Sequence, residues 1–195
     1  MASRNGDSGP TRGDLPRADR PSAKRRTRTD PPVRDPTRYS LTDHFLERLG
    51  QPGRYASTEL VSEAIRRGQL RWNDTEGWRF ALVEEGIRVV VVVEDTETAS
   101  PVVVTAWTEV VDRDRAMASR RWGPADVHTI RLRTALSTDA DSHVPDEIRP
   151  CDVDRPFVVG NHRISTRPGD GFVVCADCNR RFRSKARLRD RPCRD

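Results

Sequence analysis

The stretch IRVVVVV, residues 87–93, carries the strongest structural signal in the chain. Its five consecutive valines are β-branched, which favours an extended backbone, and a run of this kind is apolar on both sides of a strand. We therefore expect a central strand that is covered on both faces. Similar β-branched or aromatic segments lie on either side of it, separated by turn residues. The expected strands are residues 69–72, 78–83, 87–93 and 102–107.

Two amphipathic helices are predicted before these strands. The first begins after Thr42, a residue type whose hydroxyl caps helices, and ends at Gly50. The second covers residues 58–67 and ends at Gly68. Each helix is apolar on one side only, so each needs a surface to cover. The expected fold class is therefore α+β, with two N-terminal helices packed on a small antiparallel sheet.

Composition divides the chain into four parts. Residues 1–38 are expected to form a disordered basic tail, 39–115 the α+β domain, 116–150 an extension and linker, and 151–195 a small C-terminal module. Counting Lys and Arg against Asp and Glu gives these parts net charges of +5, −5, 0 and +5. Residues 126–136 alternate between apolar and polar side chains, which favours a strand over a helix.

The C-terminal module contains the one stretch whose spacing predicts chemistry. It reads His-x12-Cys-x2-Cys-x14-Cys, and the residues are His162, Cys175, Cys178 and Cys193. A C-x-x-C knuckle directs two thiolates at one tetrahedral ion, and a histidine and a third cysteine complete the ligands of a structural zinc site. Cys151 is an alternative to His162 as the fourth ligand. Because the chain begins without an apolar signal segment, we expect zinc rather than a disulfide.

The surroundings of these ligands agree with a small zinc module. Residues 161–165 and 171–174 are expected to form a β-hairpin, and residues 181–188 a short helix that returns the chain to Cys193. The stretch resembles treble-clef or ribbon-like zinc modules. Asn179 stands where such modules commonly have glycine, and asparagine also tolerates the left-handed backbone that the turn requires.

Basic residues at both ends of the chain indicate nucleic acid, DNA or RNA, as the partner, because clustered positive charge binds phosphate backbones. The candidate phosphate-binding residues are Arg180, Arg181, Arg183, Lys185, Arg187 and Arg189. An alternative is a protein-interaction adaptor whose basic ends hold an acidic protein partner. The chain has no apolar run of membrane-spanning length, so no membrane partner and a cytoplasmic location are expected.

The order of two helices and four strands, with TDHFLER at residues 42–48 and VVTAW at 103–107, resembles small domains of the RelE/ParE toxin superfamily. The resemblance covers residues 39–111. It implies an alternative function as an active or degraded mRNA endonuclease, a metal-independent ribonuclease with His44 and Arg48 as candidate catalytic residues. The acidic balance of the middle domain opposes RNA binding. We therefore favour a non-catalytic protein with structural zinc that binds nucleic acid through its C-terminal module.

Overall fold

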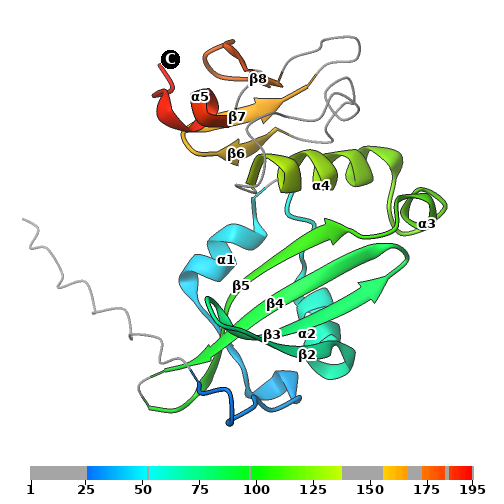
Figure 1. Cartoon of the computed structure of the whole chain (residues 1–195), viewed down its shortest axis with the longest axis vertical. Coiled ribbons are helices and arrows are strands. Elements are labelled where there is room, and N and C mark those ends of the chain that lie inside the picture. The colour runs from blue at the N-terminus through cyan, green and yellow to red at the C-terminus, as the bar shows by residue number, and fades with distance from the viewer. Residues whose placement is uncertain are drawn as a thin grey trace, which may run out of the picture.

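The computed structural model describes residues 26–51, 53–96, 98–137, 156–166, 173–182 and 185–194. These residues form two β-sheets and five α-helices, so the chain has a mixed helix and strand fold (Figure 1). None of the helices within these ranges is long and apolar enough to cross a membrane. The predictions for residues 1–25, for the part of the extension and linker at 138–150 and for Cys151 lie outside the described residues.

A five-stranded sheet has β4 (Ile87–Asp95) at its centre, as the valine run predicts, and the strand order is β1-β5-β4-β3-β2. The other strands are β1 (Ser40–Leu41), β2 (Gln69–Asn73), β3 (Gly77–Glu84) and β5 (Pro101–Val110). Val91 is 0% exposed and its neighbours Val90 and Val92 are 4% exposed, so both faces of β4 are covered. The two-residue strand β1 pairs in parallel with β5. The expectation of a wholly antiparallel sheet is wrong in that one strand.

Helices α1 (Asp43–Leu49) and α2 (Thr58–Arg67) begin at hydroxyl caps. The Phe45 amide donates to Oγ1 of Thr42 and the Leu60 amide donates to Oγ of Ser57, each at 3.2 Å. Helix α2 packs against β3 and β4, and α1 packs against β5. The buried apolar residues between these helices and the sheet include Phe45, Leu60, Val61, Ala64, Ile65, Phe80, Val89, Val91 and Val103.

Residues 26–38, assigned to the tail from composition, contact the five-stranded sheet. Arg26 forms an ion pair of 2.8 Å with Asp95 at the end of β4. The indole of Trp78 donates a hydrogen bond of 2.9 Å to the Thr27 carbonyl. A short 3-10 helix (Pro36–Arg38) then leads into β1. Contacts with the sheet therefore begin well before residue 39.

Helix α4 (Pro124–Ser137) follows the short helix α3 (Arg113–Met117) and lies between the two sheets (Figure 1). The strand predicted over residues 126–136 is wrong. Val127 and Ile130 of α4 are buried in the core of the five-stranded sheet, whereas Leu132 and Leu136 are buried in the core of the second sheet. At 3.6 residues per turn these pairs point to opposite sides of the helix. The helix therefore lacks the single apolar stripe that would have indicated it in the sequence.

The second sheet has four antiparallel strands in the order β6-β7-β8-β9. They are β6 (Phe157–Val159), β7 (His162–Ser165), β8 (Val173–Cys175) and β9 (Arg181–Phe182), and helix α5 (Lys185–Asp190) follows them. The predicted hairpin is present as β7 and β8, with Ile164 opposite Cys175. Its turn lies outside the described residues.

Candidate metal centre

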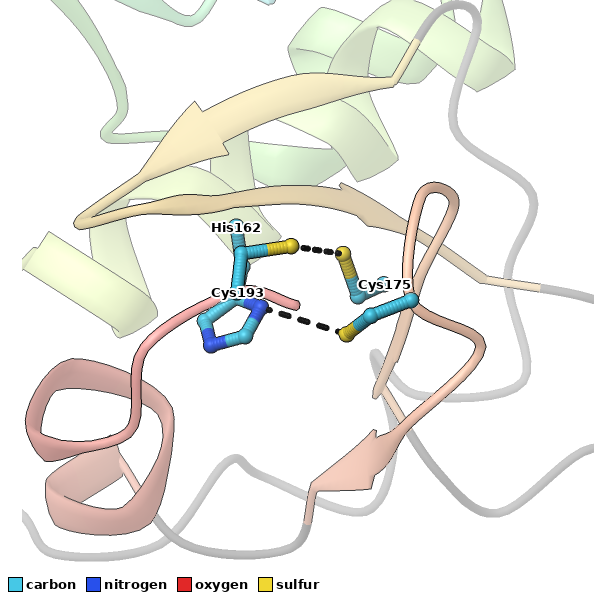
Figure 2. Close-up of side chains that lie close together, drawn as sticks. His162, Cys175 and Cys193 are labelled. Atoms are coloured by element: carbon cyan, nitrogen blue, oxygen red, sulfur yellow. Dashed lines mark hydrogen bonds between the residues drawn. The ribbon is translucent and has the colours of Figure 1, made fainter. Parts of the chain in front are cut away.

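Four side chains of the second sheet and its C-terminal extension converge on one point. The ligand atoms of His162, Cys175, Cys178 and Cys193 all lie within 4.8 Å of one another. His162 begins β7, Cys175 ends β8, Cys178 lies in the turn after β8, and Cys193 follows α5. Figure 2 shows the side chains of His162, Cys175 and Cys193 directed toward one another. The cluster can therefore hold a metal ion.

The C-x-x-C turn is shaped by its backbone. The Cys175 carbonyl accepts a hydrogen bond of 3.0 Å from the Asn179 amide, and the Cys175 amide donates one of 2.9 Å to the Arg180 carbonyl. Asn179 has φ of +53°, the left-handed conformation expected for this position. The Ala176 amide donates to the Arg163 carbonyl at 2.7 Å, which ties the turn to β7. The turn therefore holds both cysteines toward the same point.

The imidazole of His162 is oriented by contacts outside the cluster. Its Nδ1 lies 3.6 Å from the Cys178 sulfur, while its Nε2 lies 2.9 Å from the Arg191 carbonyl oxygen. A carbonyl only accepts, so Nε2 carries the proton and Nδ1 presents a lone pair to the cluster. The ring is 0% exposed and packs at 4.8 Å between centroids on Phe182. A backbone carbonyl that fixes the histidine tautomer is a usual companion of a metal-binding imidazole.

Two of the thiols have shifted pKa values. Burial opposes the Cys175 thiolate, but hydrogen bonds from the amides of Cys178 and Asp177 favour it, and its pKa is lowered to about 6. Desolvation, together with the sulfurs of Cys175 and Cys178, raises the pKa of Cys193 to about 12. A cation bound among the three sulfurs would favour the thiolate form of each.

Helix α4 provides part of the apolar shell around the cluster. Leu132 and Leu136 pack in one core with Phe157 of β6, with Ile164 of β7 and with the Cys175 side chain. The guanidinium of Arg189, in α5, donates a hydrogen bond of 3.0 Å to the Leu136 carbonyl. Sequence reasoning missed these helix contacts and the Arg191 carbonyl, because spacing identifies ligand side chains but not the backbone groups and distant helix that support them.

The predicted phosphate-binding residues have different surroundings. Arg181 and Arg187 are exposed, and the Arg180 guanidinium donates to the Pro192 carbonyl at 3.0 Å. Lys185 is only 4% exposed, so it is not available to a phosphate at the surface. The prediction that Lys185 contacts phosphate is therefore wrong. Arg183 lies outside the described residues.

The two residues implied by the toxin resemblance do not share a cavity wall. Arg48 donates a hydrogen bond of 3.2 Å to Oγ1 of Thr105 and lines a cavity beside β5. His44 is exposed on α1 and is not among the described residues that line this cavity. The catalytic role of His44 and Arg48 stays a prediction.

No protein-family model, curated protein or solved structure matches this chain. The likeness to RelE/ParE domains and to treble-clef modules stays a prediction.

Proposed function

We propose that the four-residue cluster binds one structural zinc ion and that the C-terminal module which it stabilises binds nucleic acid. Two of the distances between ligand atoms support the assignment of zinc. Two sulfurs bonded to one tetrahedral zinc ion lie about 3.8 Å apart, and a sulfur and a nitrogen about 3.6 Å apart. The Cys175 and Cys193 sulfurs are separated by 3.7 Å, and the Cys178 sulfur and His162 Nδ1 by 3.6 Å.

The donor set also favours zinc over other divalent cations. Three thiolates and one imidazole are soft ligands, whereas calcium and magnesium take oxygen ligands in larger number. Four protein ligands fill a tetrahedral shell and leave no position for a substrate or for water, so the ion would stabilise the module rather than catalyse a reaction.

Metal content measured by mass spectrometry of the purified chain tests this assignment. We expect one zinc ion per chain, lost in Cys175→Ser and in His162→Ala. The matched control is Cys151→Ser, which removes the remaining cysteine of the chain and should keep the ion. Zinc retained in His162→Ala but lost in Cys151→Ser would replace the histidine by Cys151 in the ligand set.

Nucleic-acid binding is supported by the charge and exposure of the module. Residues 151–195 carry a net charge of +5, and Arg181 and Arg187 are exposed on neighbouring elements, β9 and α5. Side chains of this kind contact backbone phosphates and release counterions, so binding should weaken steeply with salt and depend little on sequence.

Fluorescence polarisation with labelled duplex DNA and single-stranded RNA, measured across a salt series, tests this surface. Reversing the charge of Arg181 and Arg187 together should lower the slope of log K against log salt by about 2 for duplex DNA. Arg71 and Arg120 are exposed arginines outside both basic ends of the chain. Reversing the charge of these two residues is the matched control and should leave the slope unchanged. Equal slopes in the two double variants would refute binding through the module.

A further inference from the structure

A second polar site lies between the five-stranded sheet and α4. A cavity of about 470 Å³ is lined there by Arg48 of α1, Arg54 from the α1–α2 loop, Trp107 of β5 and Arg133 of α4. The volume falls in the range of cavities that hold small organic ligands. None of its lining residues belongs to the metal centre.

Within the part of the chain that the structure describes, the three arginines in the cavity wall form no ion pair. Arg48 donates to the hydroxyl of Thr105, and Arg54 donates to the Gln51 side-chain oxygen at 3.2 Å and to a backbone carbonyl at 3.4 Å. All of these acceptors are uncharged. Among the residues that the structure describes, no carboxylate lies within ion-pairing distance of Arg48, Arg54 or Arg133.

Arg133 is the member of the group with an unsatisfied donor. Its Nη1 is buried and has no hydrogen-bond partner among the residues that the structure describes. Arg133 lines the cavity, and its guanidinium lies 6.0 Å from the centre of the Phe157 ring in the core of the second sheet. A buried guanidinium donor without an acceptor costs free energy, and proteins retain such groups where a ligand supplies the acceptor.

The two acidic residues of the cavity wall are already engaged. Glu109 accepts hydrogen bonds from Arg88 at 3.2 Å and from the Trp107 indole at 2.7 Å. Glu76 is 3.5 Å from Arg79. Because each carboxylate faces an arginine outside the cavity lining, the part of the cavity wall that the structure describes is positively charged.

In the free protein, burial and mutual repulsion lower the pKa values of two of the arginines. Desolvation, followed by the charge of Arg48, lowers the pKa of Arg54 to about 10. Desolvation, followed by the charges of Arg54 and Arg48, lowers the pKa of Arg133 to about 9. A bound anion would offset both the burial and the mutual repulsion of the three cations.

We propose that this cavity binds a small organic phosphate. A phosphate monoester offers three terminal oxygens and close to two negative charges at neutral pH, which suits three guanidinium groups better than a single carboxylate does. The hydroxyls of Thr134 and Ser137 add donors to the wall. The cavity is larger than phosphate alone requires, and the Trp107 ring provides a surface for the organic part.

Calorimetric titration of the full-length, metal-loaded chain with inorganic phosphate, with adenosine 5′-monophosphate and with acetate tests the proposal. We expect adenosine 5′-monophosphate to bind most tightly, phosphate more weakly and acetate not measurably at millimolar concentration. Arg133→Gln and Arg48→Gln should each weaken binding of the two phosphates by about tenfold or more. Arg71→Gln, an exposed arginine outside the cavity, is the matched control and should bind as the parent chain does.

Thermal unfolding separates a ligand site from a structural role for Arg133. Without phosphate, Arg133→Gln should unfold at the same temperature as the parent chain or higher, because the substitution removes repulsion and an unsatisfied charge. Added phosphate should raise the unfolding temperature of the parent chain only. Equal stabilisation of both proteins by phosphate, or no binding of either phosphate to the parent chain, would overturn the proposal. If Arg133→Gln does not fold, Arg48→Gln takes its place in this comparison.

A competition experiment distinguishes binding of a small ligand from binding of a nucleic-acid backbone. An oligonucleotide without terminal phosphates should not displace adenosine 5′-monophosphate from the cavity. Displacement that is lost in Arg133→Gln would instead assign the three arginines to nucleic-acid binding. Because the titration uses none of the basic residues of β9 and α5, failure of nucleic-acid binding by the module leaves this result unaffected.

Discussion

Among the residues that the structure describes, the core of the five-stranded sheet contains sixteen buried apolar residues, whereas the core of the four-stranded sheet contains eight. Two of those eight, Leu132 and Leu136, come from α4, and a third is Cys175, a member of the metal centre. The first region therefore relies mainly on hydrophobic burial. We expect the smaller second core to depend also on α4 and on metal binding at the His/Cys cluster.

Removing the metal should have the largest effect, and it should separate the two regions. Structural zinc sites of small modules contribute on the order of 10 kcal/mol to folding. We expect a chelator under reducing conditions to abolish amide-exchange protection in β6 to β9 while β3, β4 and β5 stay protected. Cys175→Ser should give the same pattern without a chelator. Retained protection of β7 and β8 after the metal has been removed would show that the apolar core alone holds the module.

Helix α4 contributes residues to both cores, so the two regions can be compared by substitutions within one helix. Ile130 and Leu132 are two residues apart and each is 1% exposed, but they belong to different cores. Truncation of either to alanine should cost about 2–5 kcal/mol. Ile130→Ala should lower the denaturant midpoint of the five-stranded sheet, and Leu132→Ala should weaken metal binding.

Two measurements separate these outcomes. All four tryptophans of the chain lie between residues 72 and 122, so their fluorescence reports on the first region alone. A chromophoric chelator measures metal release from the second region. If both variants changed both signals to the same extent, the two cores would form one cooperative unit and the distinction between the regions would fail.

The same contrast explains how far the sequence could predict the structure. The valine run of β4 and the capped helices α1 and α2 were predictable because each has one simple environment, a covered strand or a helix on a sheet. Helix α4 was not, because its apolar residues serve two cores on opposite sides and their spacing does not show a helical period. Propensity and pattern cannot show that a second core lies behind a helix.

The metal centre was predictable in its ligands but not in its surroundings. The spacing of His162, Cys175, Cys178 and Cys193 identified the four side chains that the fold brings together. The Arg191 carbonyl that orients His162 has no sequence signature, since every residue has a carbonyl. The arginine-lined cavity was missed for a similar reason. Arg54 and Arg133 are far apart in sequence, and only the docking of α4 against β5 brings them to one wall.

The smallest predicted effect concerns the backbone of the metal-binding turn. Asn179 adopts φ of +53°. This left-handed conformation destabilises most L-residues by about 1–2 kcal/mol, and asparagine and glycine by less. Asn179→Ala should therefore weaken metal binding by about fivefold to tenfold and leave the tryptophan-monitored unfolding of the first region unchanged. Competition with a chromophoric chelator measures the affinity.

Asn179→Gly separates the backbone from the side chain at this position. Glycine adopts the left-handed conformation freely and loses only some additional entropy on folding, so its metal affinity should stay within about twofold of the parent chain. If alanine and glycine weakened binding equally, the asparagine side chain rather than the backbone angle would be the stabilising feature. If alanine also shifted the tryptophan signal, the turn would be coupled to the five-stranded sheet through α4, and the metal centre would stabilise both regions rather than one.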